Sequence, residues 1–358
     1  MIELVNTGGA AACKNATSVQ PFSVADFDGK IVPEREWCVR NFIPHRTVTL
    51  ISGDGGVGKT QLALQLCAAK ATNTNWLGLE TRPGRTLFVS AEDDVSELHR
   101  RMLAIRLHLG VSWPKLGEVN LWPLAGENAV LGCFNAHKAT VTPTPLFTCL
   151  ETTVLAKMVD TVILDTLSDV FAGDENDRQQ ARQLIGQFRG LALRTDTTII
   201  VTAHPSLRGL ENGSGLSGST AWNNSVRSRL YFDFDRDGDT RKLKVLKSNY
   251  GRSKISVDVR WQNGVYVPIA ESEKVARAPE AVDQCFLALL ERYNQQERWV
   301  GASRATNYAP TVFARDPACN GFSITDLTDS MNRLFDAKAI TVRTEGPPSR
   351  QRKRIVRV

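Results

Sequence analysis

One eight-residue segment, "GDGGVGKT" at residues 53–60, constrains the fold of this chain more than any other. It follows the β-prone run "TVTLIS" and precedes the helix-forming run "QLALQLCAAKAT". It matches G-x-x-x-x-G-K-[ST] at Gly53, Gly58, Lys59 and Thr60, in the strand–loop–helix context that a phosphate-binding loop requires. Glycines let backbone N–H groups wrap phosphates, and the start of the helix adds partial positive charge. The segment therefore predicts nucleotide binding.

The loop predicts a site for ATP and Mg²⁺. We expect Lys59 to pair with the β- and γ-phosphate oxygens and the Thr60 hydroxyl to ligate magnesium. Asp165 closes the apolar strand "TVILDT" and is expected to hold the magnesium, directly or through water, because ligands bind at the carboxyl ends of such strands. The residues expected to contact the nucleotide are Gly53, Asp54, Gly55, Gly56, Val57, Gly58, Lys59, Thr60 and Gln61.

The order of apolar patterns predicts an α/β fold. β-branched runs alternate with helical stretches up to His204, which is typical of a mostly parallel sheet flanked by helices on both faces. The Gly/Ser-rich segment "PSLRGLENGSGLSGST" then predicts a long functional loop. Beyond it, closely spaced strands predict an antiparallel extension of the sheet.

Composition shifts divide the chain into four parts. We expect a flexible N-terminal arm at 1–30, an ATPase domain at 31–270, a linker at 271–280 and a small C-terminal domain at 281–358. In the last part, amphipathic helices precede a basic hairpin, which predicts a winged-helix-like domain. The second of these helices should turn five residues inward: Ile324, Leu327, Met331, Leu334 and Phe335.

Charge and cysteine content narrow the function classes. The 358 residues carry a net charge of +6, which suits a polyanionic partner, and the tail from Arg343 is the most basic segment. That tail would bind DNA or a replication partner, or it is simply a solvated surface. Seven scattered cysteines without a C-x-x-C pair argue against a disulfide framework and a zinc site. No apolar run is long enough for a membrane span, so we expect a soluble, cytoplasmic protein.

Hydrolysis needs a group that polarises the attacking water, and Glu92 in "FVSAEDD" is the candidate base. The alternative is that Glu92, like Asp93 and Asp94, only favours the start of the following helix through its dipole. His204 closes the strand "IIVTAH" and could contact the γ-phosphate as a sensor of hydrolysis, although a lone histidine is usually structural.

Basic residues after the Gly/Ser segment are candidates for completing the site of a neighbouring subunit. An arginine inserted from an adjacent protomer neutralises the charge that develops during phosphoryl transfer. Arg227 and Arg229 in "WNNSVRSRLYF" are both candidates, and spacing alone does not choose between them. "LKSNYGR" adds Lys247 to the same region.

Six motifs in order resemble the RecA-like ATPases of the plasmid RepA type, hexameric helicases that are more distantly similar to DnaB. They are "GDGGVGKT", "SAEDD", "VILDTLSDVFAGDEND", "VTAHPS", "GSGLSGSTAWNNSVRSRLYF" and "LKSNYG", and the resemblance runs from about residue 35 to 268. It implies that Glu92 is the catalytic base, His204 the sensor and Arg227 the trans arginine finger. It also implies that Lys247, on the same subunit edge, contacts the nucleotide. It places the segment from Leu207 to Ser217 where RecA-type proteins carry a DNA-contacting loop.

The resemblance implies an ATP-hydrolysing DNA motor. We expect a homo-oligomer, a hexameric ring, that moves along single-stranded DNA as the replicative helicase of a plasmid, phage or integrated element, with a replication initiator or primase as a further partner. The alternative is an ATP-switched regulatory or recombination-mediator protein that binds DNA without unwinding it. A small-molecule kinase would explain the phosphate loop but neither the arginines nor the basic tail.

Overall fold

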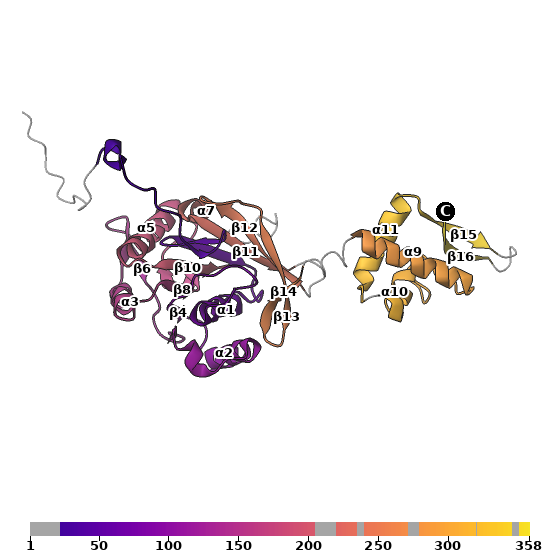
Figure 1. Ribbon diagram of the computed structural model, residues 1–358, viewed down its shortest axis with the longest axis horizontal. Helices are drawn as coiled ribbons and strands as arrows, with labels where there is room; N and C mark the ends of the chain where they lie inside the picture. The colour runs from indigo at the N-terminus through magenta and orange to yellow at the C-terminus, as the bar shows by residue number, and fades with distance from the viewer. Residues whose placement is uncertain (1–21, 205–219, 235–239, 271–278, 320, 346–350) are drawn as a thin grey trace, which may run out of the picture. The chain divides into compact units, whose positions relative to one another are not determined.

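The computed structural model describes residues 22–204, 220–234, 240–270, 279–319, 321–345 and 351–358 (Figure 1). The predicted DNA-contacting loop from Leu207 to Ser217 lies outside these ranges. So do the N-terminal arm up to residue 21 and most of the predicted linker at 271–280. Among the helices in the described ranges, none is both long enough and apolar enough to cross a bilayer.

A nine-stranded sheet forms the centre of the predicted ATPase domain, in the order β14-β13-β12-β11-β3-β10-β8-β4-β5. Six neighbouring strands from β11 to β5 are parallel, and the other three, β12, β13 and β14, are antiparallel. The parallel strands are β3 (Val48–Gly53), β4 (Thr86–Ser90), β5 (Val119–Pro123), β8 (Thr161–Asp165), β10 (Thr198–Ala203) and β11 (Ser228–Phe234). The antiparallel strands are β12 (Thr240–Ser248), β13 (Ser256–Gln262) and β14 (Val265–Pro268). The predicted α/β fold with a mostly parallel sheet and an antiparallel extension is confirmed.

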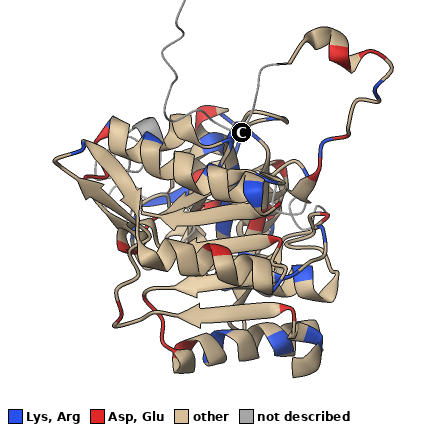
Figure 2. Ribbon diagram, turned by 90° about the vertical axis from the view of Figure 1, so that its left-hand side faces the viewer, with Lys and Arg blue, Asp and Glu red and all other residues tan. Residues whose placement is uncertain are grey.

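Helices cover both faces of this sheet, which is why its central strands are continuously apolar. In β8, Ile163 packs into the hydrophobic cluster on one face, while Val162 and Leu164 pack into the cluster on the other. The first face is covered by α1 (Lys59–Thr72) and α2 (Val95–Leu109). The second is covered by α3 (Pro145–Ala156), α4 (Leu167–Val170), α5 (Arg178–Arg194) and α7 (Thr220–Ser225). Charged residues lie mostly on the helices and loops around the strands (Figure 2).

Smaller elements surround this core, and the sequence patterns did not predict them. A hairpin is formed by β1 (Trp37–Val39) and β2 (Ile43–Pro44), and a short helix η2 (Trp113–Leu116) precedes β5. A three-stranded sheet is formed by β6 (Gly132–Asn135), β7 (Thr140–Pro143) and β9 (Phe171–Ala172). The described residues before Glu36 contain one short helix, η1 (Val24–Phe27), and belong to a separate unit.

The C-terminal residues have a hydrophobic cluster of their own, centred on Phe286, Leu289 and Phe313. Three α-helices precede a two-stranded antiparallel sheet. The elements are α9 (Pro279–Gln295), α10 (Ala309–Phe313), η3 (Pro317–Cys319), α11 (Ile324–Asp336), β15 (Ile340–Glu345) and β16 (Arg352–Arg357).

The predicted inward face of α11 is correct only in part. Leu327, Met331 and Leu334 are buried, and Phe335 is partly buried against the same cluster. Ile324, in contrast, is 47% exposed. It is the first residue of the helix and does not belong to the cluster, so helical spacing alone placed it wrongly.

Candidate nucleotide-binding site

The predicted phosphate loop lies between β3, which ends at Gly53, and α1, which begins at Lys59. Gly58 has φ of +94°, in the left-handed region that favours glycine. A Cβ atom there would also lie 1.9 Å from the hydroxyl oxygen of Tyr266. At Gly53, a Cβ atom would lie 2.2 Å from the carbonyl oxygen of Phe232. Packing therefore requires glycine at both ends of the loop, in addition to the need for free N–H groups at the phosphates.

The Lys59 side chain is held inside the loop. Its ammonium donates to the carbonyl oxygens of Gly53 at 2.7 Å and Asp54 at 3.0 Å, and the residue is 5% exposed. Burial lowers the pKa of Lys59 below its ordinary value, and the neighbouring carboxylates of Asp165 and Glu92 partly offset this. A buried cation beside carbonyl oxygens is suited to exchange these contacts for the stronger ones that phosphate oxygens provide.

Asp165 lies directly opposite the start of α1, as predicted. Its carboxylate accepts hydrogen bonds from the Thr60 hydroxyl at 2.8 Å and from the Thr202 hydroxyl on β10. Asp165 is 1% exposed, and burial raises the pKa of its carboxyl, while the two hydrogen bonds act in the opposite direction. A buried carboxylate beside a threonine hydroxyl is a donor set that fits Mg²⁺.

The fit to magnesium depends on the nucleotide. In the described ranges, no group of three or more His, Cys, Asp or Glu side chains could hold a metal ion. Mg²⁺ is usually bound by one or two protein groups together with substrate phosphates and water. Thr60 and Asp165 would therefore hold the ion together with ATP, where it supplies charge neutralisation at the phosphates.

Glu92 follows β4 at the same edge of the sheet. The strand end Ser90 pairs with Asp165, and the backbone N–H of Ala91 donates to the carbonyl oxygen of Asp165 at 2.9 Å. Burial, together with the negative charges of Asp165 and Asp169, raises the pKa of Glu92. The Glu92 carboxylate has no hydrogen bond or ion pair within the part of the chain that the structure describes. It is therefore available for water, as a general base must be.

The two neighbouring acids have structural roles, and that of Asp94 at the start of the helix is the expected one. The Asp94 side chain caps α2 by accepting from the backbone N–H of Glu97 at 2.8 Å. The Asp93 carboxylate pairs with the Arg101 guanidinium on α2 at 2.7 Å. The helix start thus uses Asp93 and Asp94, which separates them from Glu92.

His204 follows β10, next to β3 in the sheet, and reaches the phosphate loop. Its Nδ1 atom lies 3.3 Å from the Lys59 ammonium nitrogen. Burial, followed by the charge of Lys59, lowers the pKa of the imidazole, which favours the neutral form that accepts a hydrogen bond from Lys59. The structure thus brings Lys59, Thr60, Glu92, Asp165 and His204 together at one edge of the sheet.

The antiparallel extension anchors the phosphate loop, which the sequence patterns did not reveal. The Tyr266 hydroxyl on β14 donates to the Val57 carbonyl oxygen at 2.6 Å, and the Arg241 guanidinium lies 3.3 Å from the same oxygen. The Gln65 side chain on α1 pairs with both backbone groups of Tyr266. The Gln61 amide, which we expected at the nucleotide, donates instead to the Gly264 carbonyl oxygen at 2.7 Å. These contacts join residues about 200 positions apart, and no local pattern signals them.

Arg227 and Lys247 lie at the end of the sheet where β3 begins, whereas the phosphate loop lies at the end where β3 stops. The backbone N–H of Arg227 donates to the carbonyl oxygen of Val48, the first residue of β3, whereas the loop follows the last. The Lys247 ammonium donates to the carbonyl oxygens of Asn223, Asn224 and Val226 at 2.7–3.2 Å, just before Arg227. Neither basic group therefore lies at the phosphate loop of its own protomer.

Arg229 differs from Arg227 in its burial. Arg229 is 3% exposed, and its guanidinium lies 3.4 Å from the Ser52 hydroxyl in the middle of the sheet. Burial lowers the pKa of Arg229 to about 10. Arg227 is only partly buried.

The fold and this site define a RecA-like P-loop ATPase: a parallel core sheet with a phosphate loop after one strand and an acid at the end of another. The chain belongs to the AAA_25 family, described as AAA domain, whose model matches residues 13–209. The match covers more than half of the chain.

Individual relatives are distant. The chain is 22% identical to the DNA repair protein RadA of Synechocystis sp. (strain ATCC 27184 / PCC 6803 / Kazusa) over 206 residues. That alignment covers 56% of this chain and 36% of RadA, so the chain spans about a third of that relative's length. A crystal structure of a KaiC-like protein from Pyrococcus horikoshii OT3 is 16% identical, with a TM-score of 0.43. It covers 65% of this chain and 94% of its own.

Proposed function

We propose that this protein is an oligomeric ATP-hydrolysing DNA motor, the replicative helicase of a plasmid, phage or integrated element. It hydrolyses ATP at subunit interfaces in a hexameric ring and moves along single-stranded DNA in the cytoplasm. A replication initiator or primase is the expected partner. The observation that carries the proposal is the position of Arg227 relative to the phosphate loop of its own protomer.

The register of the sheet gives the size of that separation. β11 runs parallel to β3, with Ser228 beside Thr49 and Phe232 beside Gly53. At about 3.3 Å per residue, the five steps from Val48 to Gly53 put the backbone of Arg227 roughly 16 Å from the start of the loop. An arginine at this separation from its own phosphate loop can act as a finger only in the site of a neighbour.

Lys247 supports this role of Arg227 by position rather than by contact with nucleotide. Its three hydrogen bonds hold the turn from α7 into β11, because they satisfy carbonyl oxygens at the end of a helix. The backbone N–H of Asn249 also donates to the Arg227 carbonyl oxygen at 3.0 Å. The segment that carries Arg227 is thus fixed from β12. The Arg227 guanidinium lies 3.2 Å from the side-chain oxygen of Asn249, a contact that it would exchange for phosphate oxygens at an interface.

In the proposed cycle, ATP binds with its phosphates on the loop and beside Lys59. Glu92 accepts a proton from the attacking water, and Arg227 of the adjacent protomer neutralises the charge on the transferred phosphoryl group. His204 contacts Lys59 and continues directly into residue 205, so loss of the γ-phosphate would be reported to the following segment. Hydrolysis would then be coupled to DNA through that segment.

The second candidate is an ATP-switched regulatory or recombination-mediator protein that binds DNA without unwinding it. It is favoured by the similarity to RadA, which is a DNA repair protein. Both candidates share the nucleotide site and differ in whether hydrolysis displaces a strand.

ATPase rates measured against protein concentration, with and without single-stranded DNA, test the assembly. We expect the rate per subunit to rise with concentration and with DNA, because each site needs a neighbour. A rate that is independent of both would contradict the motor. Strand displacement on a forked duplex, with Lys59→Ala as the control, separates the candidates: ATP-dependent DNA binding without displacement would support the switch.

A further inference from the structure

In the C-terminal residues, acidic side chains lie on a helix and basic side chains lie on the hairpin. α11 carries Asp326, Asp329 and Asp336, and its one arginine, Arg333, is paired with Asp283 at 2.7 Å. A helix that enters the major groove must approach phosphates on both sides, so unpaired acids on its surface oppose such docking.

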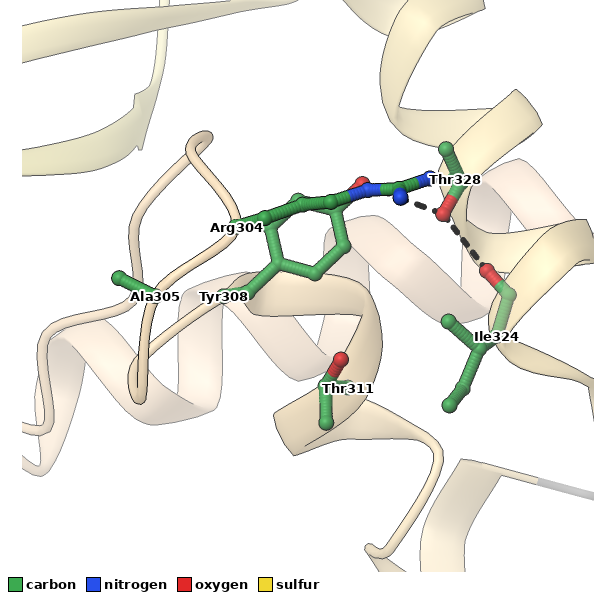
Figure 3. Close-up of a pocket in the computed structure, with 6 residues that line it drawn as sticks. All are labelled: Arg304, Ala305, Tyr308, Thr311, Ile324 and Thr328. Carbon is green, nitrogen blue, oxygen red and sulfur yellow. Dashed lines mark hydrogen bonds between the residues drawn. The ribbon is translucent and has the colours of Figure 1, made fainter.

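The hollow beside the start of α11 is also poor in positive charge. It encloses about 410 Å³, and Figure 3 shows Arg304 as the one charged side chain among the six that line it. The Thr328 hydroxyl there donates to the Ile324 carbonyl oxygen at 2.7 Å and lies 3.2 Å from the Tyr308 hydroxyl. The polar groups of Thr328 are therefore already used within the domain.

The hairpin of β15 and β16 is strongly basic instead. Arg343 lies directly opposite Arg354 in the antiparallel register, and Glu345 lies opposite Arg352. Residues that face each other across such a pair share one face, so three arginines and one acid lie on the face away from the buried Ile355. Like charges placed directly opposite each other destabilise a hairpin, and Glu345 offsets this only in part.

Glu345 neutralises one of the three arginines. Its carboxylate lies 2.6 Å from Arg354, whose side chain is only 17% exposed, and 4.0 Å from Arg343. The Arg343 side chain is 61% exposed, and Arg352 is exposed without an ion pair among the described residues. Arg352, together with Arg343 at the outer limit of ion-pair distance from Glu345, is thus available for an external anion.

An aromatic side chain completes this face. The guanidinium carbons of Arg354 and Arg352 lie 5.3 Å and 5.9 Å from the centre of the Trp299 ring. Trp299 is partly exposed, and the carbonyl oxygen of its neighbour Val300 accepts from the backbone N–H of Ile355 at 2.9 Å. Both guanidinium groups lie over the ring, so the exposed part of the tryptophan is what an unpaired base can stack against, with cations nearby for the adjoining phosphates.

We propose that the outer face of the hairpin, defined by Trp299, Arg343 and Arg352, binds single-stranded nucleic acid, with phosphates on the arginines and a base against the tryptophan. A duplex hides its base faces, so the site prefers single strands. This binding needs neither ATP nor assembly, and it goes beyond the proposed motor activity.

The test measures binding of a labelled oligothymidylate to the full chain without nucleotide, at several salt concentrations. Arg343→Ser with Arg352→Ser should lower affinity and reduce the slope of log affinity against log salt by about 1.4, at about 0.7 per phosphate contact on a single strand. The control is Arg178→Ser with Arg182→Ser, two exposed arginines on α5, which should leave affinity and slope unchanged. Unchanged binding in the hairpin variant, or an equal loss in the control, would overturn the proposal.

Trp299→Leu separates stacking from charge. It should weaken binding roughly 5- to 150-fold, the range for one stacked base, without changing the salt slope. Because Trp299 is partly buried, an abasic oligonucleotide serves as a second probe: the unaltered protein should bind it more weakly by a similar factor. If the unaltered protein binds abasic, single-stranded and duplex DNA equally well, base stacking on the hairpin is refuted.

Discussion

Replacing Tyr266 by phenylalanine removes one hydroxyl group that joins the antiparallel extension to the phosphate loop. That hydroxyl donates to the Val57 carbonyl oxygen at 2.6 Å, and Tyr266 is 2% exposed. Burial raises the pKa of Tyr266 to about 12, so the hydroxyl keeps its proton at any working pH. The ring stays in place in the variant, so the change isolates the hydrogen bond.

The size of the effect follows from what remains at Val57. A buried neutral hydrogen bond contributes about 0.5–1.5 kcal/mol, and an acceptor left without any partner costs more. The Arg241 guanidinium still lies 3.3 Å from the Val57 carbonyl oxygen, so the acceptor keeps a partner and the loss should be about 1 kcal/mol. This corresponds to a melting temperature roughly 2–4 °C lower. It also corresponds to roughly fivefold weaker ATP binding, if the bond holds the loop in its binding conformation.

Thermal melting and binding of a fluorescent ATP analogue measure the two effects on one preparation. Tyr293→Phe is the matched control, because it removes a hydroxyl that donates to Asp316 at 3.0 Å in the C-terminal residues. It should leave ATP affinity unchanged. ATP affinity unaltered in Tyr266→Phe would show that the loop does not depend on β14 and would refute the reasoning.

Three further predictions concern the site itself. Glu92→Gln should keep ATP binding but slow phosphate release by roughly 10²- to 10⁴-fold. Burial and Asp165 raise the pKa of Glu92, so the hydrolysis rate of the unaltered protein should begin to fall at a higher pH than an ordinary carboxyl would give. This acidic decrease in the pH–rate profile should be absent in the variant. Asp165→Asn should raise the melting temperature of the nucleotide-free protein. A raised pKa in the folded state means that stability is lost as pH rises and the buried carboxyl ionises, and asparagine removes that loss. An unchanged or lower melting temperature above neutral pH would contradict this. Arg227→Ala should slow hydrolysis by about 10³-fold or more at unchanged melting temperature. Arg229→Ala should instead lower the free energy of unfolding by roughly 1–3 kcal/mol, because Arg229 is buried. The opposite pattern would make Arg229 the finger.

The sequence predicted the local parts of this site well. The phosphate loop is one continuous segment, and the carboxyl ends of parallel strands meet at one edge, so Asp165, Glu92 and His204 could be expected beside it from the sequence. The contacts of His204 with Lys59 and of Asp165 with Thr60 depend on the strand order, which the alternation of strands and helices does not give.

Contacts between distant segments were not predictable in the same way. The pairing of Gln65 with Tyr266 spans 201 positions, and neither residue type signals a partner. The resemblance made Lys247 a nucleotide contact, and it did not signal that the Lys247 ammonium donates to three carbonyl oxygens at the end of α7 within its own protomer. Ile324 fitted the helical spacing and is nevertheless exposed, because spacing shows which residues share a face and not where the core ends.

Mixing two defective variants tests the shared active site most directly. Lys59→Ala removes the phosphate contact, and Arg227→Ala removes the arginine offered to the neighbour, so each variant alone should hydrolyse almost no ATP. When the two exchange subunits, an intact loop from one should meet an intact arginine from the other, and the mixture should regain activity. A mixture whose co-assembly is confirmed but whose rate never exceeds the sum of the separate rates would contradict hydrolysis between subunits.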